Sequence, residues 1–166
     1  LRDRIKVLTG VQSRQDIHMP SVGDADVIAM HQGGGKTAVQ VFFFRQGRNY
    51  GARLFYPVHG KDRSREEILS AFIAQFYADK LVPPMILVDI APEGSAVLAE
   101  ALSTRAGHRV RILVPQAGDK KRLIDSARKN AEESLARTLA ESKEQTRLLA
   151  RVAEIFDMKE PPKRIE

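Results

Sequence analysis

The chain has 166 residues, of which 43% are hydrophobic and 29% charged, a balance that is typical of a globular protein and excludes a disordered one. It has no cysteine, which excludes a disulfide framework and fits a reducing cytoplasm, and no apolar run near the roughly 20 residues that cross a bilayer, so we expect no membrane contact. The net charge of +6 makes nucleic acid a candidate partner, although such a charge can also serve solubility alone.

The amino-terminal segment, Leu1–Gln15, has apolar residues at a helical spacing on a strongly charged background. Pro20 and Gly23 then break any helix. We therefore expect an incoming helix and linker over residues 1–20. Because the chain starts at Leu1 and stops at "PPKRIE", we also expect both ends to continue in a longer polypeptide.

Three strand-like runs follow, at Asp24–His31, Thr37–Gly47 and Tyr50–Val58. They are rich in β-branched and aromatic residues, and the stretch Val41–Phe44 is apolar on both faces, as in a strand that is buried on both sides. Short links that contain glycine join the runs, which is typical of antiparallel hairpins. We predict a three-stranded meander.

The first of these links, "GGGKT", resembles the end of a phosphate-binding loop. That motif needs an earlier glycine, here replaced by Met30, and a helix after the lysine, whereas the residues after Lys36 favour a strand. Glycines suit a tight chain reversal because they tolerate positive φ. The link is therefore predicted to be a hairpin turn, not a nucleotide site.

Helices and strands alternate after residue 58. Ser64 and Glu67 form a capping-box pattern at the start of an amphipathic helix, and Gly107 closes a second helix. Buried strands are predicted over Val82–Ile90 and His108–Pro115. From Asp119 onward the pattern is helical over roughly 50–60 Å, so we expect a bend or an overhanging arm.

This order of elements predicts an α/β domain over residues 21–157. Its first three strands pair antiparallel and the last two parallel, giving a five-stranded mixed sheet with helices on both faces and a long C-terminal helix. This is the architecture of the RNase H-like superfamily. Residues 158–166 are expected to link it to a following domain.

Several blocks, including "FFFRQGRNYGARLFYP", "EEILSAFIAQFY" and "KKRLIDSARKNAEESL", resemble the central region of the UvrC family, and the resemblance covers nearly the whole chain. That family is the nuclease subunit of the UvrABC nucleotide excision repair system, with a GIY-YIG nuclease and a separate RNase H-like endonuclease. The resemblance implies that this chain lies between the UvrB-contacting segment and the second nuclease, with damaged duplex DNA, UvrB and the neighbouring UvrC nuclease domains as partners.

The resemblance also allows a test for nuclease residues. Active copies carry an aspartate on the first strand where this chain has Val27, and the adjacent Asp26 is expected to face the opposite side of the sheet. Asp89 matches a second carboxylate position. Asp125 matches a third, but Arg128 stands where active copies have a catalytic histidine. We therefore predict no catalytic residue, no metal ligand and no cofactor.

Basic residues form three groups along the sequence and are expected to line one groove that binds phosphates without reading sequence. The second group comprises Lys61, Arg63 and Arg65. The residues we assign to nucleic-acid binding are Arg45, Arg48, Arg53, Lys120, Lys121, Arg122 and Arg128. The rings of Tyr50, Phe55 and Tyr56 are expected in the core.

Two functions stay open from the sequence. One is a non-catalytic interaction module that spaces the two nucleases and contacts DNA or UvrB. The other is a cryptic nuclease that depends on a divalent metal and uses Asp89.

Overall fold

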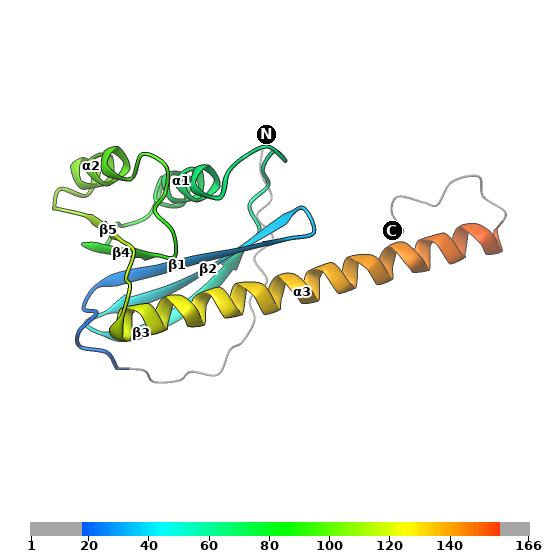
Figure 1. Cartoon of the computed structure of the whole chain (residues 1–166), viewed down its shortest axis with the longest axis horizontal. Helices are drawn as coiled ribbons and strands as arrows, with labels where there is room; N and C mark the ends of the chain where they lie inside the picture. The colour runs from blue at the N-terminus through cyan, green and yellow to red at the C-terminus, as the bar shows by residue number, and fades with distance from the viewer. Residues whose placement is uncertain (1–17, 157–166) are drawn as a thin grey trace.

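The computed structural model describes residues 18–156 as one mixed sheet with helices on both faces (Figure 1). The strand order is β3-β2-β1-β4-β5. The elements are β1 (Ala25–Gly33), β2 (Lys36–Arg45), β3 (Arg48–Phe55), α1 (Arg65–Phe76), β4 (Met85–Val88), α2 (Ser95–Ala106), β5 (Arg111–Leu113) and α3 (Gly118–Ile155). The helix predicted over Leu1–Gln15 and the linker predicted over residues 158–166 lie outside the described residues.

The strands pair in the predicted directions. β1 pairs antiparallel with β2, and β2 pairs antiparallel with β3, while β1 with β4 and β4 with β5 are parallel. The fourth and fifth strands are shorter than predicted. Pro83 and Pro84 precede β4, and a proline cannot donate a hydrogen bond to a neighbouring strand, so the ladder starts only at Met85.

Both hairpins turn on two residues with positive φ. Gly34 and Gly35 (φ +56° and +73°) link β1 to β2, so the glycine-rich loop is a hairpin turn, as predicted. Gln46 and Gly47 (φ +50° and +73°) link β2 to β3. Two residues of positive φ are typical of the type I′ turn, whose twist matches that of the strands.

Residues 18–24 fold across the β2–β3 turn and hold it. The Met19 N–H donates to the Gly47 carbonyl over 2.7 Å, and the Gly47 N–H donates to the Gly23 carbonyl over 2.9 Å. The Asp24 carboxylate accepts from the Gln46 N–H over 2.7 Å. A Cβ at position 47 would lie 2.6 Å from the Met19 oxygen, so only glycine fits in this turn.

The helices begin and end where local chemistry places them. Ser64 caps α1 in a complete capping box with Glu67, and Gly107, in the left-handed conformation, ends α2; both features were predicted. The 38 residues of α3 correspond to about 57 Å at 1.5 Å per residue. Its second half extends past the sheet (Figure 1), which confirms the predicted overhanging arm.

The sheet separates two apolar layers. On the face that α1 and α2 cover, Ile28 and Val41 pack with Phe55 and Phe72. On the face that α3 covers, β1 contributes Val27, and the other residues of this layer include Ala25, Ala29, Phe42, Leu87, Leu123, Ile124 and Ala127. Successive residues of β1 therefore face opposite layers. No helix in the described part of the chain is long and apolar enough to cross a membrane.

Candidate functional site

Val27 occupies the position on β1 where active RNase H-like nucleases are expected to carry an aspartate. Its side chain is fully buried. It lies opposite Phe42 on β2 and Leu87 on β4, and it packs in the layer that Leu123 and Ile124 of α3 complete. The position is surrounded by hydrocarbon, which cannot solvate a carboxylate or a cation.

Asp26 points to the other face of the sheet, as predicted. It is 1% exposed; the Tyr77 hydroxyl donates to it over 2.6 Å and the Arg45 guanidinium over 2.8 Å. Burial raises the pKa of Asp26, and the hydrogen bonds from Tyr77 and Arg45 oppose that rise. Burial and the neighbouring carboxylate raise the pKa of Tyr77 as well. Oδ2 of Asp26 thus ties the end of α1 to the sheet, and Oδ1 is held by Arg45 of β2.

Asp89 directly follows β4, and its side chain is 1% exposed. Oδ2 accepts from the Met30 N–H and from the Arg65 guanidinium, each over 3.3 Å. Oδ1 is buried without a hydrogen-bond partner in the described structure. Burial raises the pKa of Asp89, and the Met30 N–H and the charge of Arg65 lower it in part. An unpartnered buried oxygen favours the protonated acid, because the charged form needs more hydrogen bonds.

Asp125 has a different environment on α3. Its side chain is 48% exposed and forms ion pairs with Lys121, one turn away, and with Arg128 over 2.7 Å. The hydrogen bond from Lys121 holds the pKa of Asp125 below its ordinary value. This is the geometry of a surface helix residue.

These carboxylates do not fit a two-metal centre. Asp26 lies opposite Ile86, and Asp89 is three residues farther along the chain, just past the end of β4, or about 10 Å away. Asp125 belongs to α3, on the opposite face of the sheet from Asp26. Two catalytic cations sit about 4 Å apart and share ligands. Within residues 18–156, no three acidic or histidine side chains are grouped so that they could hold a metal.

One pair resembles a nucleophile with its base. The Thr37 hydroxyl lies 2.6 Å from His59 Nε2 and accepts from the Gln32 amide over 3.2 Å. His59 Nδ1 lies 2.9 Å from the Gly60 carbonyl, so Nδ1 donates there and Nε2 accepts from Thr37. Because Thr37 is 1% exposed, no substrate can reach it. The pair fastens the chain after β3 to the first hairpin.

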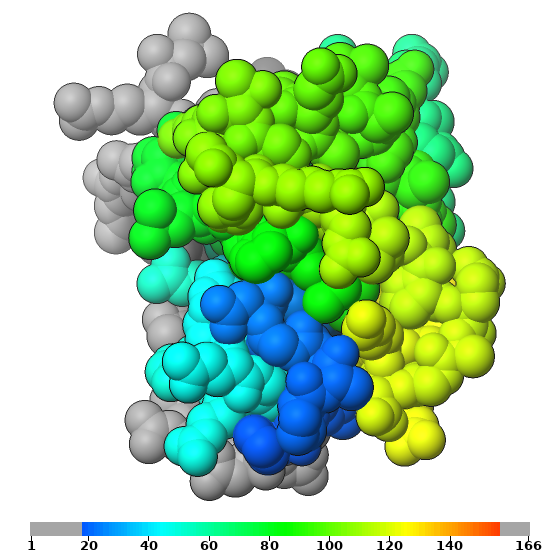
Figure 2. Space-filling model, turned by 90° about the vertical axis from the view of Figure 1, so that its left-hand side faces the viewer, coloured from blue at the N-terminus to red at the C-terminus, as the bar shows by residue number. Residues whose placement is uncertain are grey.

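The predicted basic residues are distributed over both faces of the sheet. Arg45 and Arg48 flank the β2–β3 turn, and α3 starts at the same end of the molecule. Figure 2 shows this end, with the cyan turn and the yellow start of α3 on either side of the blue residues from 18 onward. Arg53 lies on the face that α1 covers, beside Phe43, and Arg45, which donates to Asp26, lies on that face too, whereas the four basic residues of α3 belong to the opposite face. The seven residues therefore do not line one groove.

Ion pairs also neutralise part of the positive charge of these seven residues. Four of the seven residues pair with acids: Arg45 with Asp26, Arg122 with Asp119, and both Lys121 and Arg128 with Asp125. Within the described range, the three that do not pair with an acid are Arg48, Arg53 and Lys120. Of the second predicted group, Arg65 pairs with Asp89.

The expectation that the three strand aromatics lie in the core is wrong for Tyr50. Phe55 is 6% exposed, but Tyr50 is 70% exposed. The register between β2 and β3 shifts beside Phe44, so Tyr50 is the extra residue of a β-bulge and points outward. The glycine that follows it in the strand was the available signal, since an isolated strand glycine often marks a bulge.

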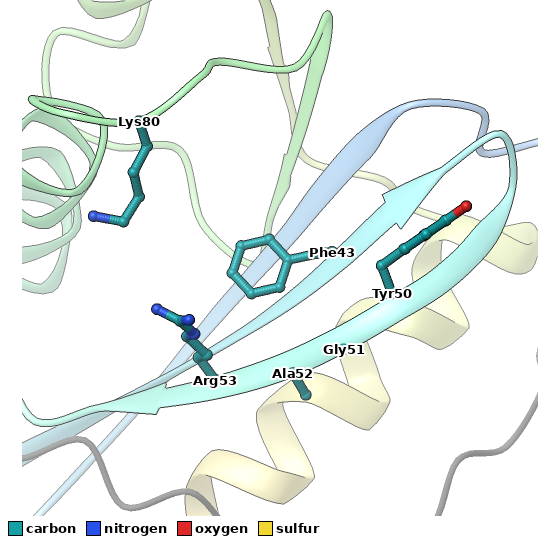
Figure 3. A pocket seen from close by; sticks show the side chains of 6 residues that line it. All are labelled: Phe43, Tyr50, Gly51, Ala52, Arg53 and Lys80. Carbon is teal, nitrogen blue, oxygen red and sulfur yellow. The ribbon is translucent and has the colours of Figure 1, made fainter.

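Tyr50 lines a shallow hollow on β3 that sequence reasoning did not find. We call it the β3 hollow; it has a volume of about 510 Å³ and is lined by Phe43, Tyr50, Gly51, Ala52, Arg53 and Lys80. Figure 3 shows the Phe43 ring at its centre, with Arg53 and Tyr50 on either side and Lys80, from the segment after α1, at the rim.

Comparison with known proteins identifies the domain. The family model described as "UvrC Ribonuclease H-like domain" matches residues 24–138. The chain is 52% identical to UvrABC system protein C of Rhodospirillum rubrum over 165 residues, or 99% of this chain and 26% of that protein. It is 48% identical to the same protein of Paramagnetospirillum magneticum, again over 99% of this chain and 26% of the relative. It thus spans about a quarter of the length of these curated relatives.

Proposed function

The chain belongs to the UvrC ribonuclease H-like domain family of the UvrABC system, and we propose that it is a non-catalytic module of that excinuclease. Its role is interaction and spacing: it separates the two nucleases of the whole protein and offers surfaces to DNA or UvrB during nucleotide excision repair. Its place of action is the cytoplasm. This fragment is not itself an enzyme, whereas the full-length protein incises DNA.

One observation carries the proposal, namely the full burial of Val27 among the side chains of β2, β4 and α3. A two-metal nuclease needs a carboxylate at the centre of the sheet that cations and water can reach. Here a hydrocarbon side chain fills that position, and Asp26 is turned away and bound to Tyr77 and Arg45. Losing one metal-ligating acid usually abolishes such chemistry.

The proposed DNA contact lies at the end of the molecule that holds the β2–β3 turn and the start of α3. Arg48 and Lys120 lie there without an acidic partner among the described residues, and Arg122 is 77% exposed despite its ion pair with Asp119. Cations on a turn and on a helix bind the phosphate backbone without reading bases. Such contacts suit a repair protein that meets lesions in any sequence.

The cleavage experiment uses the whole chain with a nicked or bubble duplex while Mg²⁺ or Mn²⁺ is titrated. We expect no incision at any metal concentration.

For DNA binding, the logarithm of affinity should fall steeply with the logarithm of salt concentration. Arg48→Gln and Lys120→Gln should each lower that slope by about 0.9 on duplex DNA, whereas Lys143→Gln, on the overhanging arm of α3, serves as the matched control. No retention of DNA at low salt would remove this part of the proposal.

A second candidate, the cryptic nuclease, is favoured by one feature, the unpartnered buried Oδ1 of Asp89, which could accept a ligand. The Arg65 guanidinium lies 3.3 Å from the other oxygen of the same carboxylate and would repel a cation, so we rank this function below the first. Metal-dependent incision that Asp89→Asn abolishes, and that Asp125→Asn leaves intact, would establish the second function and end the first.

A further inference from the structure

We propose that the β3 hollow binds one unpaired nucleotide of a single DNA strand, with its base stacked on the aromatic rings and its phosphate held by Arg53 and Lys80. The inference rests on the proposed function, in that it assumes the domain works on DNA. It adds a separate site, on the face of the sheet opposite to the basic residues of α3.

The stacking surface is preorganised. Phe43 stacks on Phe76 with ring centroids 6.3 Å apart, and Phe76 in turn contacts the rings of Phe55, Phe72 and Tyr77. Phe43 is thus the outer member of a packed aromatic cluster, so its ring is held in place before any ligand arrives. Little ordering entropy is lost when a base stacks on a ring that is already fixed.

The backbone of the bulge that carries Tyr50 is held by a hydrogen bond. The Asn49 side-chain oxygen accepts from the Gly51 N–H over 2.8 Å, which closes the bulge around residue 50. Gly51 adopts φ +142°, and a Cβ there would meet no atom within 4 Å. The bulge therefore presents Tyr50 outward beside a bare stretch of backbone where a flat ring can approach closely.

Two cations border these rings. Within residues 18–156 no acid pairs with Arg53. Lys80 Nζ lies 4.9 Å from the centre of the Phe76 ring, and it shares its charge with the exposed Asp79 carboxylate 2.8 Å away. Aromatic faces beside cations are the combination that recognises a base and its phosphate together.

The same features disfavour a peptide strand, which is the other occupant an edge strand attracts. β3 is at the edge of the sheet, but its bulge interrupts the regular ladder, and bulges and charges on an edge protect it against strand addition. Duplex DNA is disfavoured too, because its bases are already stacked and paired. An unpaired nucleotide fits both the aromatic face and the charge.

The test measures binding of a fluorescein-labelled dT₁₂ oligonucleotide to the full 166-residue chain by anisotropy, beside an abasic oligomer of the same length. Tyr50→Ala should weaken dT₁₂ binding about 5- to 150-fold, the range for one base stack, and should leave the abasic oligomer unaffected. Arg53→Gln should lower the salt slope by about 0.7, the value for one phosphate contact on a single strand. Phe156→Ala, another exposed aromatic at the far end of α3, is the matched control and should change neither.

A second readout uses tyrosine emission, since the chain has no tryptophan and three tyrosines. Stacking on Tyr50 should quench part of that emission after correction for absorption by the oligonucleotide. Tyr50→Phe should keep the affinity and lose this quench, whereas Tyr50→Ala should lose both. Because Tyr50 is 70% exposed, both variants should keep the wild-type melting temperature.

The outcomes separate the two proposals. If dT₁₂ binds with a steep salt slope but Tyr50→Ala and Arg53→Gln bind like wild type, the nucleotide site is refuted and DNA contact elsewhere stands. If dT₁₂ does not bind at low salt, the nucleotide site is also refuted. If the chain instead self-associates as its concentration rises, and a proline substituted into β3 abolishes this association, then the β3 edge of the sheet is a protein-docking strand.

Discussion

Replacing Val27 by residues of different polarity measures how strictly this position in β1 excludes water and cations. Val27 is fully buried, so Val27→Ala deletes two buried methyl groups and leaves a cavity in the core. At about 0.8 kcal/mol per carbon, with a cavity contribution of similar size, the expected loss is about 2–3 kcal/mol of unfolding free energy. This variant sets the cost of lost packing alone.

The polar variants then report on the environment. Val27→Thr keeps the shape but buries a hydroxyl among hydrocarbon groups, which costs about 1–3 kcal/mol. Val27→Asp buries an acid without a partner and should cost more than either, about 3–5 kcal/mol. Since small domains have only about 5–15 kcal/mol of stability, Val27→Asp is expected to lose a large share of it at neutral pH.

The pH dependence of Val27→Asp gives the sign of the effect. Burial among apolar groups raises the pKa of a carboxyl, so the folded variant holds its proton to higher pH than the unfolded one. The variant should therefore be most stable below the ordinary aspartate pKa and lose stability as pH rises through the raised value. Urea unfolding followed by circular dichroism at several pH values measures this. A Val27→Asp protein that matches Val27→Ala at every pH would refute the reasoning, because water or cations would then have access to the site.

Three further predictions concern other buried or constrained positions. Burial raises the pKa of Asp89, so wild type should lose stability relative to Asp89→Asn as pH rises above the ordinary aspartate pKa and through the raised one; urea titrations that show a constant difference would contradict this. Tyr77→Phe should cost about 1–3 kcal/mol, and a double-mutant cycle with Asp26→Asn should give a coupling of about 0.5–3 kcal/mol, because the two groups share a 2.6 Å hydrogen bond; additive effects would mean that the bond contributes nothing. Gly47→Ala should lower the melting temperature far more than Gly35→Ala, since both have φ +73° but only the first would clash with backbone; equal losses would mean that left-handed strain alone matters.

Local chemistry made much of the fold predictable. The capping box at Ser64, the closing Gly107 and the two-residue turns depend on neighbours a few positions apart, and these were read correctly. The directions of strand pairing followed from the sequence of elements, because parallel connections need crossover helices and hairpins do not. The opposite facing of Asp26 and Val27 followed from the period of two in a strand.

Contacts between distant residues were not predictable in the same way. The hydrogen bond from Tyr77 to Asp26 joins residues 51 positions apart, and nothing in either local pattern indicates it. The ion pairs that occupy Arg45 and Arg65 are similar cases, so the sequence overstated the free positive charge. Separation of the basic residues onto two faces also depends on which helix covers which side of the sheet.

Tyr50 shows a third limit. Alternation along a strand predicts which side a residue faces only while the register is constant, and one extra residue at the bulge inverts it. A strand glycine two residues after an asparagine is a weak signal of such a bulge. The β3 hollow therefore became visible only when the register of β2 and β3 was known.

The most direct measurement of the central claim is a titration of the ¹⁵N-labelled chain with Mn²⁺, observed through the amide signals of residues 25–30 and 86–90. A paramagnetic ion broadens the signals of amides close to it. The account predicts no saturable broadening at these positions, because Val27 supplies no ligand and the acids nearest to it are bound to Tyr77 and Arg65. Saturable broadening of both segments at low Mn²⁺ concentration, lost in Asp89→Asn, would contradict it.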